Sequence, residues 1–318
     1  MNRHTTTGHW KLGLALASTT MVAWATLAPA LKIALEVLDP MTLTWVRFLI
    51  AGVISAAFLL TRKKYRGEIF KLGKSMWGLM LLASVMLIAN YVFYLMGLEK
   101  TTPANAQVII QLAPALLAMG GIMLFHEKYN RWQWLGFFTL ISGLLLFFKD
   151  QLGVMAGNIS SYQTGILLIV GASIVWAIYA LAQKQLLRDI SSVSAMTFMY
   201  IFATIALLPA SEPATLLELD SLHWWIVGFC AINTLVAYGA FAEAMDHWEA
   251  SRVSAIVSLT PLGTILTAAV IHHYWPQLMG SENIDLIGWI GTLMVIIGSV
   301  LTAMAGDNQQ QAVNLPAD

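Results

Sequence analysis

The side chains that could do chemistry in this chain are amides, hydroxyls and aromatic rings, which recur at helical spacing inside apolar segments. Gln107 and Gln111 are four residues apart, as are Asn90 and Tyr94, so each pair shares one face of a helix. Uncharged polar groups beside rings suit a neutral or zwitterionic solute with an apolar part. Hydrogen bonds that only hold helices together are the alternative.

Enzymatic and metal chemistry finds little support in the residue pattern. His126-Glu127 lacks a second histidine four positions after the first, and His272-His273 has no carboxylate or cysteine at metal-ligand spacing. A glycine-rich phosphate loop is also missing. We therefore expect no enzyme activity, no catalytic residue, no metal and no cofactor. The formal net charge of +0 gives no reason to expect a nucleic-acid partner.

The elements that must position these groups are membrane-spanning helices. Hydrophobic residues make up 58% of the 318 positions and charged residues 11%, with a mean hydropathy of +0.71. A soluble chain carries about 25% charged residues. Continuously apolar runs of about 20 residues are each long enough to cross a bilayer as a helix. The predicted spans are 12–33, 41–61, 77–98, 103–125, 132–148, 163–184, 192–210, 224–245, 252–273 and 286–305.

The chain contains one pattern twice. Residues 21–35 and 173–187 align with Trp24 on Trp176 and Lys32 on Lys184. Further matched pairs are Tyr91 with Tyr238, Pro114 with Pro261, Gly136 with Gly291 and Gly143 with Gly298.

We predict five spans in each copy, and an odd number makes the second copy enter the membrane inverted. The expected units are residues 1–150, residues 151–306 and a polar cytoplasmic tail, 307–318. Inverted repeats of this kind are a transporter architecture, with the substrate site near the midplane between the copies.

Several short patterns carry a family resemblance. They are Pro40 followed by Arg47-Phe48, the segment QLAPALLAMGGIMLFHEK, and the spacing of Gly136 and Gly143. With the two five-helix copies, they make the chain resemble the drug/metabolite transporter superfamily, in its ten-helix form with two EamA-type domains. The resemblance implies a secondary transporter working by alternating access. It also implies export, with amino acids or related metabolites as the substrate class.

Two other functions remain open. One is an uptake carrier or exchanger for nucleosides, sugars or phosphorylated metabolites, although a phosphorylated solute would require several cations in the cavity. The other is a membrane sensor or scaffold, which would not need polar residues at matched midspan positions. The expected partners are a small-molecule substrate and the lipid bilayer, and we expect a monomer or weak homodimer.

We predict a midplane substrate pocket drawn from both copies, because a site at a repeat interface should use both. Its residues are Trp24, Asn90, Tyr94, Gln107 and Gln111 from the first copy, and Trp176, Tyr179, Tyr238, Ser254 and Ser258 from the second. Pro114 and Pro261 each remove a backbone hydrogen bond from the middle of a helix, so each is a candidate hinge or a fixed kink. Gly136, Gly143 and their matches are expected to allow close helix packing.

Two charges could also have a role. Arg47 lies inside a span, about 10 Å by helical rise from the predicted outer end. We expect it to extend toward the outer headgroups, or to pair with Glu36 or Asp39, rather than to contact substrate. Glu243 is the remaining candidate for proton coupling. Its position near a helix end argues against such coupling, and we expect transport without an imposed pH gradient.

The distribution of basic residues predicts the orientation. Placing both termini in the cytoplasm puts most of the 17 Lys and Arg inside, including those of the loop at 62–74. The loop at 211–221 carries acidic residues and no Lys or Arg, so it is expected outside. Short loops favour a bacterial protein, in the cytoplasmic (inner) membrane.

Overall fold

The computed structural model describes residues 9–62, 65, 67–125, 130–149, 160–248, 250–282 and 284–304. Among these residues, the regular secondary structure is helical. The predicted tail at 307–318 lies outside these residues. The first copy contains α1 (Trp10–Ala34), α2 (Pro40–Thr61), α3 (Lys74–Lys100), α4 (Pro103–Ile109), α5 (Leu112–Phe125) and α6 (Arg131–Phe147). The second contains α8 (Ser161–Leu186), α9 (Ser192–Leu207), α10 (Ser221–His247), α11 (Ala250–Val257), α12 (Thr260–Tyr274) and α13 (Leu286–Met304). Short 3₁₀ helices are η1 (Ile69–Lys71), η2 (Leu208–Ala210) and η3 (Pro213–Glu218).

The chain is a polytopic membrane protein of ten spans, as predicted. Seven helical segments are long and apolar enough to cross a membrane on their own. The segment formed by α4 and α5, together with α6 and α13, supplies the remaining three. The prediction was wrong in one respect, because the fourth and ninth spans are each two helices. Their breaks are part of the candidate site described below.

Polar residues at the membrane edges start the helices, because the first backbone N–H groups of a helix need an acceptor. The Asp39 carboxylate accepts from the N–H groups of Met41 and Thr42 at the start of α2. Ser191, its match in the second copy, accepts from the N–H of Ser194 at the start of α9. The repeat therefore fixes where helices begin as well as where they cross.

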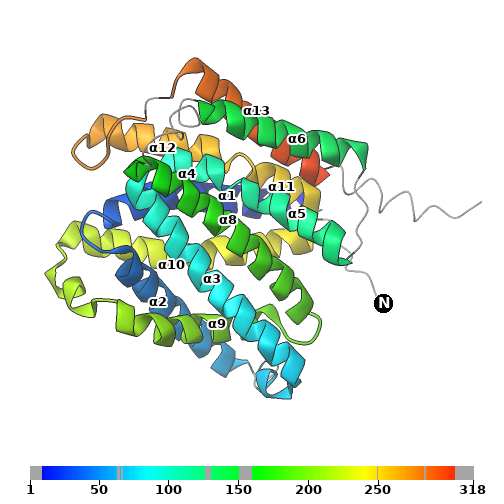
Figure 1. Ribbon diagram of the computed structural model, residues 1–318. Coiled ribbons are helices and arrows are strands. Elements are labelled where there is room, and N and C mark those ends of the chain that lie inside the picture. The colour runs from blue at the N-terminus through cyan, green and yellow to red at the C-terminus, as the bar shows by residue number, and fades with distance from the viewer. Residues whose placement is uncertain are drawn as a thin grey trace, which may run out of the picture.

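Helices of one copy pack mainly against helices of the other (Figure 1). Helix α1 packs on α10, and α3 packs on α8. Because α1 matches α8 and α3 matches α10, these are the same contact made twice. Helices α2 and α9 pack on each other, and so do α6 and α13. This pattern is the approximate twofold relation of an inverted repeat, and it makes the two copies interlock.

The α3–α8 and α1–α10 crossings are hydrogen-bonded at matched positions with the donor exchanged. Asn90 Nδ2 donates to Ala172 O at 3.0 Å, from α3 to α8. Thr20, which matches Ala172, donates through Oγ1 to the carbonyl of Ala237, which matches Asn90, at 3.4 Å. The α1–α10 crossing has a second such bond, because Asn233 Nδ2 of α10 donates to Ala23 O of α1 at 2.8 Å.

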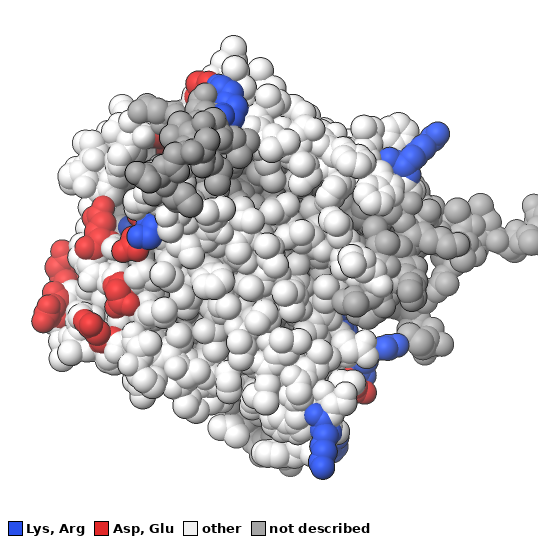
Figure 2. All heavy atoms as spheres, in the orientation of Figure 1, with Lys and Arg blue, Asp and Glu red and all other residues white. Residues whose placement is uncertain are grey.

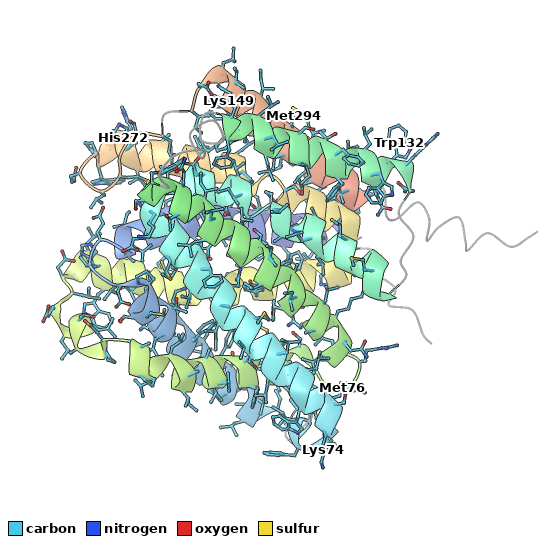
Figure 3. All side chains as sticks on the ribbon, viewed as in Figure 1. Lys74, Met76, Trp132, Lys149, His272 and Met294 are labelled. Carbon is cyan, nitrogen blue, oxygen red and sulfur yellow. The ribbon has the colours of Figure 1, made fainter. Side chains whose placement is uncertain are left out.

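Helices α6 and α13 approach each other closely at positions that are occupied by glycine. Gly143 lies against Gly291, and Gly136 lies against Gly298. A Cβ added at Gly298 would be 2.4 Å from Leu140 N and 2.6 Å from Gly136 O. The prediction that the matched glycines allow close packing is confirmed. Figure 3 labels Trp132 and Met294 on this pair.

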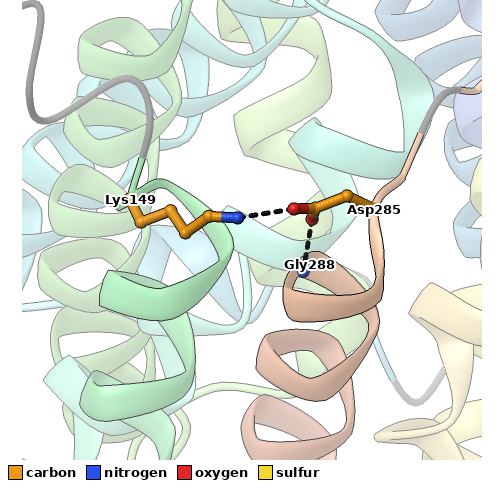
Figure 4. Close-up of polar contacts among 3 residues, drawn as sticks. All are labelled: Lys149, Asp285 and Gly288. Carbon is orange, nitrogen blue, oxygen red and sulfur yellow. Dashed lines mark hydrogen bonds and ion pairs between the residues drawn. The ribbon is translucent and has the colours of Figure 1, made fainter.

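An ion pair joins the same two helices where α6 ends and α13 begins (Figure 4). Lys149 Nζ donates to Asp285, whose other carboxylate oxygen accepts from the Gly288 N–H at 2.7 Å. The Lys149 ammonium and then this backbone bond hold the pKa of the Asp285 carboxyl below its usual range. The contact links the two copies outside the spans.

The two ends of the helix bundle differ in charge (Figure 2). We call the end with the loops at 35–39, 208–220 and 275–285 the acidic end, since it holds Glu36, Asp39, Glu212, Glu218, Asp220, Glu282 and Asp285. The opposite end, with Arg62, Lys71, Lys74, Arg131, Arg188 and Arg252, is the basic end. In Figure 3, Lys149 and His272 lie toward the acidic end, whereas Lys74 and Trp132 lie toward the basic end.

Candidate functional site

Matched residues of the two copies meet in the middle of the bundle. The side chains of Tyr91 and Tyr238 interact with each other. The rings of Phe48 and Tyr200, also a matched pair, have centroids 5.8 Å apart. A residue can touch its own repeat equivalent only close to the twofold axis. These contacts therefore locate the axis, and with it the place where a site shared by both copies would lie.

Four of the predicted pocket residues form one connected polar and aromatic cluster beside this axis. Tyr94 OH donates to Gln107 Oε1 at 3.3 Å, and Gln107 Nε2 donates to Trp24 O at 3.4 Å. The Trp24 ring meets the Tyr238 ring in a T-shaped contact, with centroids 5.5 Å apart. We call these four residues the central cluster. Helices α1, α3 and α4 of one copy and α10 of the other supply it.

The broken spans lie next to each other at a second contact. Residues 110–111 separate α4 from α5, and residues 258–259 separate α11 from α12. The side chain of Gln111 at one break donates through Nε2 to Ser258 O at the other, at 3.3 Å. Ser258 Oγ is 2.9 Å from Ser299 Oγ. Two more predicted pocket residues are thus brought together.

Proline explains the positions of the breaks. Pro114 and Pro261 have no N–H for the carbonyl four residues earlier, so the helix tightens just before each of them. The N–H of Gln111 donates to Val108 O at 3.3 Å, and the N–H of Leu259 donates to Ile256 O at 3.1 Å, both three residues back. A kink at each predicted proline is therefore present. Movement about it stays a prediction.

The other predicted pocket residues whose side chains are described have contacts of their own. The Asn90 amide is used in the α3–α8 crossing, as described above. Tyr179 is buried, and its hydroxyl contacts Met196 Sδ at 3.4 Å. Trp176 is half-buried against the main hydrophobic core. The side chain of Ser254 lies outside the described part of the structure. Asn90 and Tyr179 thus have packing contacts, and a role of these four in binding remains a prediction.

The prediction that Arg47 extends toward the headgroups or pairs with Glu36 or Asp39 was wrong. Arg47 is 4% exposed, and its Nη2 donates to Thr234 Oγ1 at 3.0 Å. The guanidinium carbon lies 4.8 Å from the centroid of the Tyr91 ring. The side chain points toward α10 rather than toward headgroups, because α2 is buried over about two turns, from Thr42 to Phe48. The Asp39 carboxylate is used as the cap of α2, and Glu36 is exposed.

Glu243 lies near the basic end of α10 with an exposed side chain. Its Oε1 is 3.3 Å from His247 Nε2, one helical turn further on. A surface pair of this kind contributes little to stability. Glu243 follows Tyr238 of the central cluster by five residues along α10, and a charge role for Glu243 stays a prediction.

Sequence reasoning missed Thr234 and Tyr200. Thr234 holds the Arg47 guanidinium, and Tyr200 packs on Phe48 at the axis. Both carried a signal. Thr234 is four residues before Tyr238 and so shares its helix face, and Tyr200 is the repeat equivalent of Phe48.

Comparisons with known proteins agree with this architecture. The model of the EamA-like transporter family matches residues 11–149 and again 163–304. An uncharacterized transporter of Haemophilus influenzae is 35% identical over 293 residues, which covers 92% of this chain and 95% of that protein. The uncharacterized inner membrane transporter YhbE of Escherichia coli K12 is 35% identical over 297 residues, covering 92% of this chain and 91% of YhbE.

One solved crystal structure is similar in fold, with a TM-score of 0.61 and 19% sequence identity, and the likeness covers 96% of this chain and 100% of that one. The family model matches the chain twice, and the relatives align along nearly its full length. Both findings agree with the repeat and with the polar cluster at its axis. The chain belongs to the EamA-like transporter family and is a multi-pass membrane transporter of small molecules.

Proposed function

We propose that this protein exports amino acids, or related neutral or zwitterionic metabolites, across a bacterial inner membrane as a monomer or weak homodimer. The observation that carries this proposal is the central cluster, in which the Gln107 amide links Tyr94 to Trp24 beside the twofold axis. Amide and hydroxyl groups beside rings fit a zwitterion with an apolar side chain better than they fit a sugar phosphate. Uptake or exchange of such solutes is the alternative direction.

The packing of the helices supports alternating access. At the acidic end, α4 packs against α12 and α1. The matched contacts at the basic end would be α11 with α5 and α8, and neither is among the packed pairs of the described residues. The α4 contacts at the acidic end therefore have no equally packed counterpart at the basic end among the described residues. If each copy adopted the conformation of the other, these contacts would form at the basic end and be lost at the acidic end. That arrangement would be the second state that a carrier needs.

The orientation is the first testable part of this proposal. We expect the basic end and both termini to be cytoplasmic, because Lys and Arg concentrate on the cytoplasmic side of membrane proteins. Lys71→Cys at the basic end and Glu218→Cys at the acidic end place thiols at exposed positions. Cys230 is buried, so the native thiol should contribute no background.

An impermeant maleimide added to intact cells should label the cysteine at 218 and not the cysteine at 71, whereas permeabilised cells should show both. The reverse pattern in intact cells would invert the topology and the proposed direction of opening.

The second test is transport itself. We expect the wild type in proteoliposomes to exchange at least one of the twenty amino acids. We expect Gln107→Ala to lower that flux roughly tenfold or more, since one change removes both hydrogen bonds of the central cluster. The flux of radiolabelled solute by counterflow is the measurement.

Gln277→Ala is the matched control, because Gln277 is exposed in the loop between α12 and α13. Its flux should equal that of the wild type. Wild-type flux in Gln107→Ala at equal reconstitution would leave the central cluster as a helix-packing contact, and no wild-type flux for any amino acid would reject the substrate class.

A further inference from the structure

Arg47 is a cation deep inside the protein. It lies seven residues into the 22-residue α2, which places its Cα roughly 10 Å from the helix end by helical rise. At 4% exposure, Arg47 has almost no surface open to bulk water or to a lipid headgroup. An ionised group taken out of water at this depth is strongly destabilising unless it is neutralised.

The contacts of the guanidinium are incomplete. One hydroxyl, Thr234 Oγ1, accepts from Nη2 at 3.0 Å, and the Tyr91 ring lies 4.8 Å away as a cation–π partner. Buried Nε has no hydrogen-bond partner. Across the part of the chain that the structure describes, no carboxylate forms an ion pair with Arg47. A guanidinium has five N–H donors in a planar fork, so this environment leaves it short of an anion.

The same contacts connect Arg47 to the central cluster. The Tyr91 ring lies against the guanidinium, and its side chain interacts with that of Tyr238. Tyr238 in turn packs edge to face on Trp24, whose carbonyl accepts from Gln107. A positive charge thus borders one side of the cluster, while amide and ring groups border the other. A solute with an anionic group and an apolar part would complement this arrangement.

We propose that Arg47 binds the carboxylate of the transported solute. The proposal rests on the transport function proposed above and narrows its substrate class to monocarboxylates, amino acids included. A carboxylate accepts two parallel N–H bonds from a guanidinium, and Nε with one Nη is a pair that makes them. The bond would use the unpartnered Nε and supply the missing counter-charge.

The repeat limits the charge of the solute. Met199 stands at the position that matches Arg47 and is fully buried. The site therefore has one intramembrane arginine rather than a symmetric pair. One cation suits one carboxylate, whereas a phosphate monoester with about −1.5 to −2 charges would remain under-compensated.

Methionine is the replacement chosen for Arg47 in the test, because the fold already accommodates Met199 at the matched position. Arg47→Met removes the charge, Arg47→Lys keeps it without the fork, and Thr234→Val removes the hydroxyl that holds the guanidinium. Arg62→Met is the matched control, being the same substitution at an exposed position just past the other end of α2. Thermal unfolding of each purified variant reports on folding.

Counterflow in proteoliposomes is measured with three probes of one shape: L-leucine, 4-methylpentanoate without the amine, and L-leucinamide without the carboxylate. The wild type should move leucine and 4-methylpentanoate but not leucinamide. Arg47→Met should lower leucine flux roughly 10- to 100-fold, in line with the loss of a charged hydrogen bond. Arg47→Lys and Thr234→Val should give intermediate losses, and Arg62→Met none.

Two results would overturn the proposal. They are a folded Arg47→Met that moves leucine within twofold of the wild type, and a wild type that moves leucinamide as well as leucine. The second leaves the transport function standing. If Arg47→Met fails to fold, Thr234→Val and the wild-type ratio of leucine to leucinamide decide the matter. If the wild type moves no amino acid, the proposed function fails and 4-methylpentanoate decides the role of Arg47: flux in the wild type but not in the variants supports it, and no wild-type flux rejects it.

Discussion

Replacing Gly298 by alanine is expected to leave little folded protein. The new Cβ would lie 2.4 Å from Leu140 N, 2.6 Å from Gly136 O and 2.8 Å from Leu140 Cα, and all three are backbone atoms of α6. A backbone cannot rotate aside as a flexible side chain can, so α13 must move away from α6. Overpacking of a close interface costs about 1 to 3 kcal/mol or more, and membrane helix association depends on this close packing.

The measurement is the yield of monodisperse protein in detergent and its thermal midpoint. Gly228→Ala in α10 is the matched control, since a Cβ there would meet nothing within 4 Å. Alanine is also the better helix former by about 1 kcal/mol, so the control should be as stable as the wild type or slightly more so. Equal yields and midpoints for the two variants would show that α6 and α13 can separate at little cost.

Much of this architecture follows from the sequence. Apolar runs of membrane-crossing length fix the spans, and the matched Trp, Tyr, Pro and Gly residues reveal the repeat. The paired glycines were predictable as a close contact because nothing else explains two glycines at one spacing in both copies. Gln107, Tyr94, Trp24 and Tyr238 were predictable as neighbours for the same reason, since midspan depth and repeat equivalence both place residues near a twofold axis.

The direction of a side chain around its helix was harder to predict. Depth along α2 follows from counting residues to Arg47, but the sequence does not say which neighbour that face of α2 meets. The default for a membrane arginine is to reach water, and here burial against α10 prevents it. Asn90 shows the reverse case. Its polarity and depth suit a pocket, yet its amide serves a helix crossing whose matched position in the second copy, Ala237, has no such side chain.

The breaks in the fourth and ninth spans also escaped prediction. Each segment is apolar on average across its break, so hydropathy reports one continuous span. Pro114 and Pro261 signalled a disturbance, but a proline alone does not show whether the helix bends or divides. The division brings Gln111 to the carbonyl of Ser258, a contact between copies that only the three-dimensional arrangement supplies.

Cross-linking α4 to the loop between α12 and α13 is expected to stop transport. The Glu282 carboxylate accepts from the Ala104 N–H at 3.0 Å, which ties the start of α4 to the second copy at the acidic end. If that end must open during each cycle, the tie must break. Ala104→Cys with Glu282→Cys, treated with a short cleavable bifunctional thiol reagent, should bring counterflow down to background. A reductant that cleaves the linker should restore it.

Lys149→Cys with Asp285→Cys is the matched control, because this ion pair also joins the two copies outside the spans. It connects α6 and α13, which are repeat equivalents of each other. Their contact is symmetric, because Gly136, Gly143 and their matches face one another. A symmetric contact need not change when the copies exchange conformations, so this cross-link should leave the flux intact. The α4–α12 contact has no packed counterpart at the basic end among the described residues, so it must change. Undiminished counterflow in the fully cross-linked 104/282 pair would show that the acidic end does not open during transport.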